Sequence, residues 1–193
     1  MKYIISGTNR PGSNSLKVSK FIQNLYQETG EQVEIIDLAN LDLHELTGTQ
    51  YGSELPQKMS AAVQKINESE GLIMVVPEYN GSMPGALKYF IDHWKYPNTF
   101  EQRPVCFVGL GGMFGGLRPV EHLMQVFSYR NGFIFPVRVF LMNVWNILKN
   151  DQWNDPMSLQ LLKAQVDGFQ KFCRALKSVE LDANSLNSRR PAK

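Results

Sequence analysis

The stretch Ser6–Ser15, with the sequence SGTNRPGSNS, decides the fold. It follows a short apolar run, Tyr3–Ile5, which predicts a first strand. It precedes Leu16–Leu25, where apolar residues recur at helical spacing. A turn between a strand and a helix directs backbone N–H groups and the positive end of the helix dipole at one point. The stretch therefore predicts a strand, a turn that suits an anion, and a helix.

The residues of this turn favour a phosphate group. Neutral hydrogen-bond donors come from Thr8, Ser13, Asn14 and Ser15. Arg10 adds a positive charge whose planar fork matches phosphate oxygens. The turn lacks the Gly-Lys-Ser/Thr ending of a triphosphate site and the Gly-x-Gly-x-x-Gly spacing of a dinucleotide fold, which leaves a phosphate monoester. On this turn alone, an equally weighted alternative is that Ser and Asn only cap the helix.

Length and composition indicate one globular domain. The 193 residues carry a net charge of +2 and are 43% hydrophobic, which is enough for a full-sized core. Lysine and arginine are scattered, so we expect no nucleic-acid partner. No apolar run approaches the roughly 20 residues of a membrane helix, and the N-terminus does not resemble a signal peptide. We therefore expect no membrane partner and a cytoplasmic protein.

Cysteine and histidine give no sign of a metal centre. Cys106 and Cys173 lie far apart and outside any Cys-x-x-Cys pair, so the sequence predicts neither disulfides nor an iron–sulfur cluster. His44, His93 and His122 lack ligand spacing. We predict no metal site.

Strand and helix patterns alternate along the chain, which predicts an α/β fold with helices on both faces of a parallel sheet. After the first strand, further strands are expected at 33–38, 72–77, 104–110 and 134–142. After the first helix, further helices are expected at 54–70, 85–95, 117–129 and 155–177, with a loop at 39–52. The run 72–77 is apolar on both faces, as a central parallel strand requires. We assign residues 1–177 to one domain and expect 178–193 to be a flexible, extended or disordered tail.

Two further turns are expected at the same sheet edge as Ser6–Ser15. Ligands of open parallel sheets bind beyond the carboxyl ends of the strands, where Pro77–Gly85 and Gly109–Gly116 follow their strands. Tyr79 offers a flat surface, and glycine lets a ring approach the main chain. A phosphate site beside a flat, hydrogen-bonded slot describes a flavin mononucleotide (FMN) pocket. Ordinary turn chemistry is the alternative for each loop taken singly.

The same residues carry a family resemblance. Residues 77–88, PEYNGSMPGALK, are close to the PEYNGSxPGxLK signature of the NAD(P)H-dependent FMN reductases, which include quinone, chromate and azo-dye reductases. Residues 7–13, GTNRPGS, resemble that family's GSxRxxS loop, with Thr8 at the usual Ser. Residues 115–123 are similar to its third loop and following helix, although Met124 stands where Arg is common.

The resemblance implies a fold and a site. The fold is a flavodoxin-like three-layer sandwich with a five-stranded parallel sheet of order 2-1-3-4-5. The FMN phosphate is held by Thr8, Arg10, Ser13, Asn14 and Ser15. The isoalloxazine is bordered by Pro77, Glu78, Tyr79, Asn80, Gly81 and Ser82, and its other end is approached by Gly111 and Gly112.

The resemblance also implies an activity. NADPH or NADH reduces the bound FMN, and a small acceptor (quinone, azo, nitro, chromate or free flavin) is reduced in turn by a ping-pong mechanism without a side-chain catalyst. The choice between NADPH and NADH stays open, although Arg118 suits a 2′-phosphate. The family implies a homodimer or homotetramer, and the helix carrying Tyr89, Phe90, Trp94 and Tyr96 is either an interface or core. The alternatives are a flavodoxin-type electron carrier and a flavin-based redox sensor.

Overall fold

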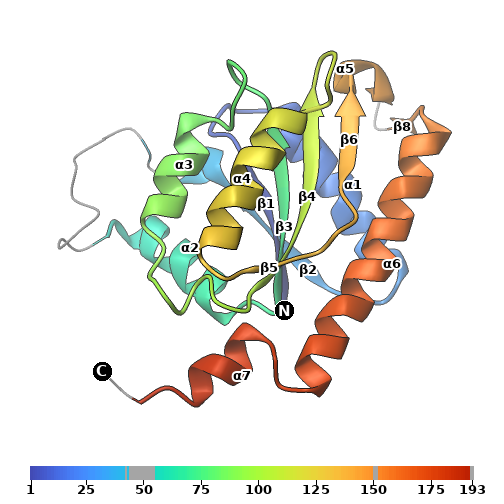
Figure 1. Cartoon of the computed structure of the whole chain (residues 1–193). Helices are drawn as coiled ribbons and strands as arrows, with labels where there is room; N and C mark the ends of the chain where they lie inside the picture. Colours follow the sequence, from blue (N-terminus) through green and yellow to red (C-terminus); the bar gives the residue numbers. More distant parts are fainter. Residues whose placement is uncertain (42, 44–54, 150–151, 192–193) are drawn as a thin grey trace.

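The structure is a computed structural model that describes all residues except 42, 44–54, 150–151 and 192–193 (Figure 1). The strands are β1 Lys2–Ser6, β2 Val33–Asp37, β3 Gly71–Pro77, β4 Pro104–Gly111, β5 Phe133–Ile134, β6 Val139–Met142, β7 Leu148–Lys149 and β8 Gln152–Trp153. The helices are α1 Asn14–Glu28, α2 Gln57–Glu68, α3 Gly85–Asp92, α4 Leu117–Tyr129, α5 Val144–Ile147, α6 Pro156–Ser178 and α7 Ala183–Ser188, with a 3₁₀ turn at Leu38–Asn40.

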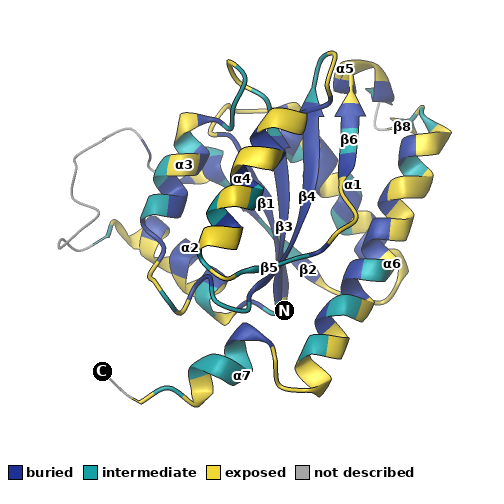
Figure 2. Cartoon of the chain, in the orientation of Figure 1, coloured by how far each residue is buried: buried dark blue, intermediate teal, exposed yellow. Residues whose placement is uncertain are grey.

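The main sheet is parallel and has the predicted order β2-β1-β3-β4-β5, with β6 also paired to β4. Figure 1 shows α2, α3 and α4 on one face and α1 and α6 on the other. Side chains of β3 alternate between the two resulting cores. Leu72, Met74 and Val76 join the core under α2–α4, whereas Ile73 and Val75 join the core under α1 and α6. The strand is therefore apolar on both faces because helices cover both (Figure 2).

The predicted fifth strand, 134–142, is wrong in one respect: it is two strands. Ile134 pairs with Val105, and Val139 pairs with Val108. Between these two pairs the chain advances five residues from β5 to β6 but only three along β4, so the pairing is interrupted. Pro136 lies in this interruption and has no N–H to donate to β4. The Gln165 amide compensates, because its Nε2 donates to Phe107 O at 2.9 Å and to Val137 O at 2.8 Å.

Other predicted elements differ mainly at their ends. The helix expected at 85–95 ends at Asp92, and the helix expected at 54–70 spans Gln57–Glu68. The predicted loop 39–52 begins with the 3₁₀ turn, and most of it lies outside the described residues. Within the described part of the chain, no helix is both long enough and apolar enough to span a membrane.

The expectation of an extended or disordered tail from residue 178 is wrong for the part that the structure describes. Helix α7 forms there, and the Asp182 carboxylate caps it by accepting from the backbone N–H groups of Asn184 and Ser185. Asn187 Nδ2 donates to Asn98 O at 2.9 Å, which ties α7 to the segment after α3. The tail is ordered by partners distant in sequence, which local composition does not reveal.

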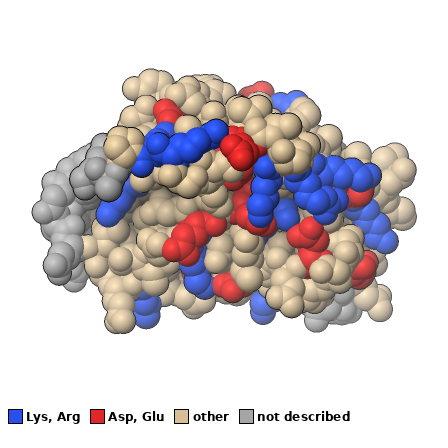
Figure 3. Space-filling view, turned by 90° about the horizontal axis from the view of Figure 1, so that it is seen from below, with Lys and Arg blue, Asp and Glu red and all other residues tan. Residues whose placement is uncertain are grey.

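Charges of both signs are interspersed on the face around α7, which Figure 3 shows from below. Several are ion pairs. Lys177 Nζ lies 2.8 Å from Glu70, and Arg190 pairs with Glu101. The hydrogen bond from Lys177 is the main cause that lowers the pKa of Glu70.

Arg103 joins the tail to the body of the protein. Its side chain is fully buried, and its guanidinium donates to main-chain carbonyls of Asn67, Ser69, Asn98 and Thr99. It also donates to Asn184 Oδ1 of α7 at 3.0 Å. Burial lowers the pKa of Arg103 to about 10, while nearby Asp182 opposes the shift, so the guanidinium stays charged at neutral pH.

We predict that Arg103→Ala lowers the free energy of unfolding by about 3 kcal/mol, because buried carbonyls lose their donor. Chemical denaturation measures the change. Arg174→Ala is the matched control, since Arg174 is 57% exposed and pairs only with Glu31 in the described structure; it should cost less than about 1 kcal/mol. Equal effects of the two substitutions would contradict the role given to Arg103.

Candidate active site

The turn between β1 and α1 ends in a capped helix. Gly12 has φ +63°, a left-handed conformation that glycine adopts without strain, and it places Ser13 at the N-cap of α1. Ser13 Oγ accepts from Leu16 N at 3.1 Å. The capping alternative is thus correct for Ser13, yet the hydroxyl proton of Ser13 is not used by that bond. Capping and anion binding are compatible at this residue.

Two other side chains of the turn fit an anionic group. Ser15 is 1% exposed, and its Oγ has no hydrogen-bond partner in the described structure. Arg10 is exposed, and among the described residues its guanidinium contacts no hydrogen-bond partner. Asn14 is also exposed at the first helical position. An unsatisfied hydroxyl, an unpaired cation and the helix dipole therefore meet at the start of α1.

The turn after β3 is a tight two-residue hairpin. Tyr79 N donates to Ser82 O at 2.9 Å and Ser82 N donates to Tyr79 O at 3.1 Å. The central residues, Asn80 and Gly81, both have positive φ values, 50° and 77°. Asn-Gly is the favoured pair for this geometry. The turn holds Tyr79, which is 39% exposed, at the carboxyl edge of the sheet.

A hydrogen bond joins this hairpin to the first turn. The hydroxyl of buried Thr8 donates to Tyr79 Oη at 3.0 Å and accepts from Arg10 N at 3.3 Å. The phenolic proton of Tyr79 is left to donate elsewhere. Thr8 thus positions a neighbour as well as belonging to the predicted phosphate set.

The glycine-rich turn after β4 folds back on itself. A Cβ on Gly109 would lie 2.7 Å from Gly115 O, and one on Gly111 would lie 2.8 Å from Gly116 N. Gly116 itself has φ +80°. The close packing of the loop is thus a sufficient reason for glycine at 111. Gly112 differs, because a Cβ added there would meet no backbone atom of the described residues within 4 Å, apart from its chain neighbours. The nearest atom would be Trp145 Cη2, at an ordinary contact distance of 3.6 Å.

Helix α4 holds the second and third turns together. Arg118 pairs with Glu78 at 3.1 Å and stacks on the Phe114 ring, with its guanidinium carbon 4.8 Å from the ring centre. One helical turn later, His122 Nδ1 is hydrogen-bonded to Ser82 Oγ at 2.9 Å. The spacing of Arg118 and His122 places both on one face of α4. Sequence reasoning gave Arg118 only a possible 2′-phosphate role and did not identify His122.

The predicted site residues therefore gather at one sheet edge. Pro77 ends β3 beside Leu110 of β4, and Glu78 N donates to Leu110 O at 2.9 Å. Neither free cysteine lies among them: Cys106 and Cys173 are buried in the core under α1 and α6, where burial raises the pKa of both thiols. In the described chain no three His, Cys, Asp or Glu side chains cluster as metal ligands.

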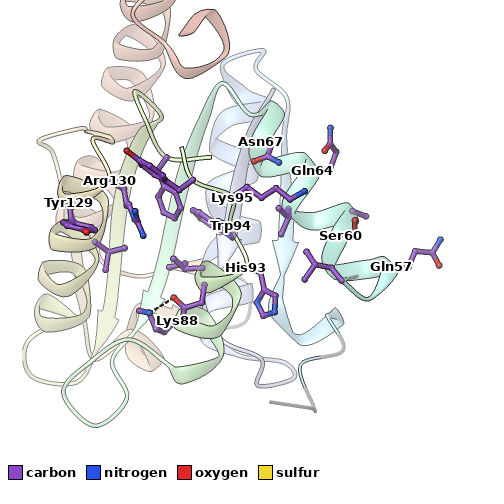
Figure 4. Close-up of a pocket in the computed structure, with 18 of the residues that line it drawn as sticks. Gln57, Ser60, Gln64, Asn67, Lys88, His93, Trp94, Lys95, Tyr129 and Arg130 are labelled. Carbon is purple, nitrogen blue, oxygen red and sulfur yellow. Dashed lines mark hydrogen bonds and ion pairs between the residues drawn. The ribbon is translucent and has the colours of Figure 1, made fainter. Parts of the chain in front are cut away.

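A separate cavity of about 1710 Å³ lies away from this edge, between α2, α3 and α4. Figure 4 shows Tyr129 and Arg130 on one side, Gln57 and Ser60 on the other, and Trp94 between them. Of the aromatic residues predicted as interface or core, Phe90 and Trp94 are buried. Tyr96 is 53% exposed, and Tyr89 is intermediate. Phe90 is therefore a core residue.

Comparison with known structures defines the class of fold. The flavoenzyme NAD(P)H:(acceptor) oxidoreductase FerB from Paracoccus denitrificans superposes with a TM-score of 0.72 at 20% identity, covering 90% of this chain and 97% of that one. A flavodoxin-like domain from Synechococcus gives a TM-score of 0.54 at 15% identity, covering 90% and 99%. The fold is flavodoxin-like.

Sequence comparison then gives the family. The model for NADPH-dependent FMN reductases matches residues 3–146, and the chain belongs to that family. An FMN-dependent NADPH-azoreductase of Staphylococcus saprophyticus is 28% identical over 139 residues, which is 70% of this chain and 73% of that protein. An NADPH:quinone oxidoreductase of Arabidopsis thaliana is 32% identical over 126 residues, 63% of each. The class is that of oxidoreductases that use FMN with NAD(P)H as the electron donor.

Proposed function

We propose that this protein transfers a hydride from NADPH or NADH, by way of FMN held in the three turns, to a small acceptor in a ping-pong reaction. The observation that carries the proposal is the linkage of the turns at one sheet edge. Thr8 connects the first turn to Tyr79, and Arg118 connects Glu78 to the third turn. Cofactors of doubly wound sheets bind at such an edge.

The residues of each turn suit one part of the cofactor. The start of α1, with Ser15 and Arg10, suits the phosphate. The hairpin supplies Tyr79 and main-chain groups for the ring, and Arg118 holds that hairpin in place through Glu78. FMN supplies the hydride chemistry when bound, so the protein needs only to bind, orient and shield it. Because FMN supplies the chemistry, the reaction needs no side chain as acid, base or nucleophile.

The acceptor class is argued from the chemistry of the edge. The exposed side chains there include the large apolar Tyr79, Met113 and Phe114. Such a surface accepts quinones, azo dyes, nitroaromatics or free flavin more readily than it selects one by specific donors. The named relatives act on azo compounds and quinones, which supports this range.

We predict that the purified protein, reconstituted with FMN, shows absorbance bands at about 370 and 450 nm that bleach with NADPH under anaerobic conditions. A spectrophotometric titration measures this. Bands that persist with NADPH and NADH but bleach with dithionite would support an electron carrier or sensor. The absence of bands after addition of FMN would overturn the proposed function.

We predict that Arg10→Ala weakens FMN binding by roughly 1.5–3 kcal/mol, because a charge-assisted contact to phosphate is lost. Fluorescence titration of FMN gives the dissociation constant. Lys20→Ala also removes one exposed charge from the same region, but farther along α1, and should leave the affinity nearly unchanged. Equal FMN affinities of the wild type and Arg10→Ala would contradict the placement of the phosphate at this turn.

We also propose that the cavity between α2, α3 and α4 receives a second copy of the chain. Its rim exposes Tyr129 (78%) and Tyr96 (53%), large aromatic surfaces that association would cover. Light scattering should give two or four times the 22.0 kDa chain mass. Tyr129→Asp should lower that mass, whereas Met157→Asp at an exposed position of α6 should not; a wild-type mass of 22.0 kDa would rule out the proposal.

A cytoplasmic location is part of the proposal, since a reducing compartment suits two free thiols. Cell fractionation with antibody detection tests it, and recovery in an extracellular fraction would contradict it.

A further inference from the structure

An unpartnered indole stands beside the third turn. Trp145 of α5 is 54% exposed, and no other described residue hydrogen-bonds to its indole or stacks on it. Met142 and Met113 are also exposed, at 58% and 77%. Figure 1 places α5 next to the loop that follows β4. These three side chains come from adjoining segments, since Met142 pairs with Gly111 and Asn143 bonds to Gly112. Large exposed apolar side chains on adjoining segments commonly mark a binding site.

The backbone fixes Trp145 in this place. Asn143 adopts a left-handed conformation, with φ +48°, at the N-cap of α5. Its N–H donates to Gly112 O at 3.1 Å, and Asn146 N donates to Asn143 O at 2.7 Å. A positive φ at a residue other than glycine is unfavourable, so the surrounding structure must hold it. The indole edge therefore lies close to Gly112: a Cβ atom added to Gly112 would be 3.6 Å from Trp145 Cη2.

Strand register relates Trp145 to the rest of the candidate site. Met142 pairs with Gly111, and Leu110 pairs with Pro77. Neighbouring strands are about 4.8 Å apart, so the ends of β3 and β6 lie about 10 Å apart across the glycine-rich turn. A planar molecule of two or three fused rings can bridge that separation. The glycine at 112 leaves this surface free of a side chain.

The chemistry of the patch selects flat, uncharged aromatic molecules. An indole stacks on aromatic rings, and methionine sulfur makes favourable contacts with ring edges. The nearby cation, Arg118, is already held by Glu78 and Phe114. The patch therefore offers dispersion and stacking and little attraction for a small inorganic anion.

We propose that Trp145, together with the exposed Met113 of the third turn and the exposed Met142 at the end of β6, is the specificity-determining residue that receives the aromatic ring of the electron acceptor. The proposal rests on the proposed function and narrows it to planar aromatic acceptors. Chromate and ferricyanide gain nothing from this contact. A second copy of the chain covering Trp145 is the competing occupant.

Steady-state kinetics of Trp145→Ala and Trp145→Phe test the proposal. With a naphthoquinone as acceptor, Trp145→Ala should raise KM roughly three- to tenfold at unchanged kcat, and Trp145→Phe should restore most of it. KM for ferricyanide and the anaerobic rate of flavin bleaching by NADPH should not change. Leu161→Ala, which removes a 43% exposed apolar side chain from α6, is the control and should alter none of these values.

An equilibrium readout separates the inference from the proposed function. The naphthoquinone should quench tryptophan fluorescence of the wild type more than that of Trp145→Phe, because Trp94 is buried and Trp153 is stacked on Phe21. If the naphthoquinone quenches in this way but NADPH does not bleach the flavin, the proposed function is wrong, whereas the aromatic binding site at Trp145 is supported. Bleaching with equal quenching and equal KM in all variants would overturn the role of Trp145. A lower oligomeric mass in Trp145→Ala would overturn it in favour of a subunit contact.

Discussion

β3 lies in the middle of the sheet with both faces covered, and this constraint organises the molecule. A strand buried on both faces needs helices on each side, which here are α2–α4 and α1 with α6. When parallel strands are joined by helices, all the turns that lead from a strand to a helix lie at the carboxyl ends of the strands, on the same edge of the sheet. The turns after β1, β3 and β4 therefore meet because the core requires it, whatever they bind.

The specific contacts at that edge then turn proximity into a defined geometry. The Thr8 hydroxyl bonds to Tyr79, the Asn-Gly hairpin fixes the Tyr79 ring, and Arg118 ties Glu78 to the third turn. Each contact joins segments far apart in sequence. Ser15 Oγ, at the start of α1, is one of the buried polar atoms that have no hydrogen-bond partner among the described residues. A rigid edge with unsatisfied donors is suited to holding a cofactor without reorganisation.

Local pattern was sufficient where the energetic cause is local. Periodicity and backbone preference predict the apolar run of β3, the helix 117–129 and the turn glycines. They also predict the fold class. The break at Pro136 was missed because the mostly apolar pattern of 134–142 outweighed one proline. The missing hydrogen bond is replaced by the amide of Gln165 on α6. Helix α7 was missed because Arg103 and Asn98 stabilise it from elsewhere in the chain. For the same reason, neither the pairing of Arg118 with Glu78 nor the exposure of Trp145 could be read from the sequence.

The central claim is that three separate turns form one FMN site, and amide hydrogen exchange of the protein with and without FMN tests it most directly. The account predicts slower exchange on FMN binding in all three turns, residues 8–15, 77–82 and 109–116. It predicts little change in α2 and in the residues after α3 that line the separate cavity. Protection confined to that cavity, or to one turn alone, would contradict the account.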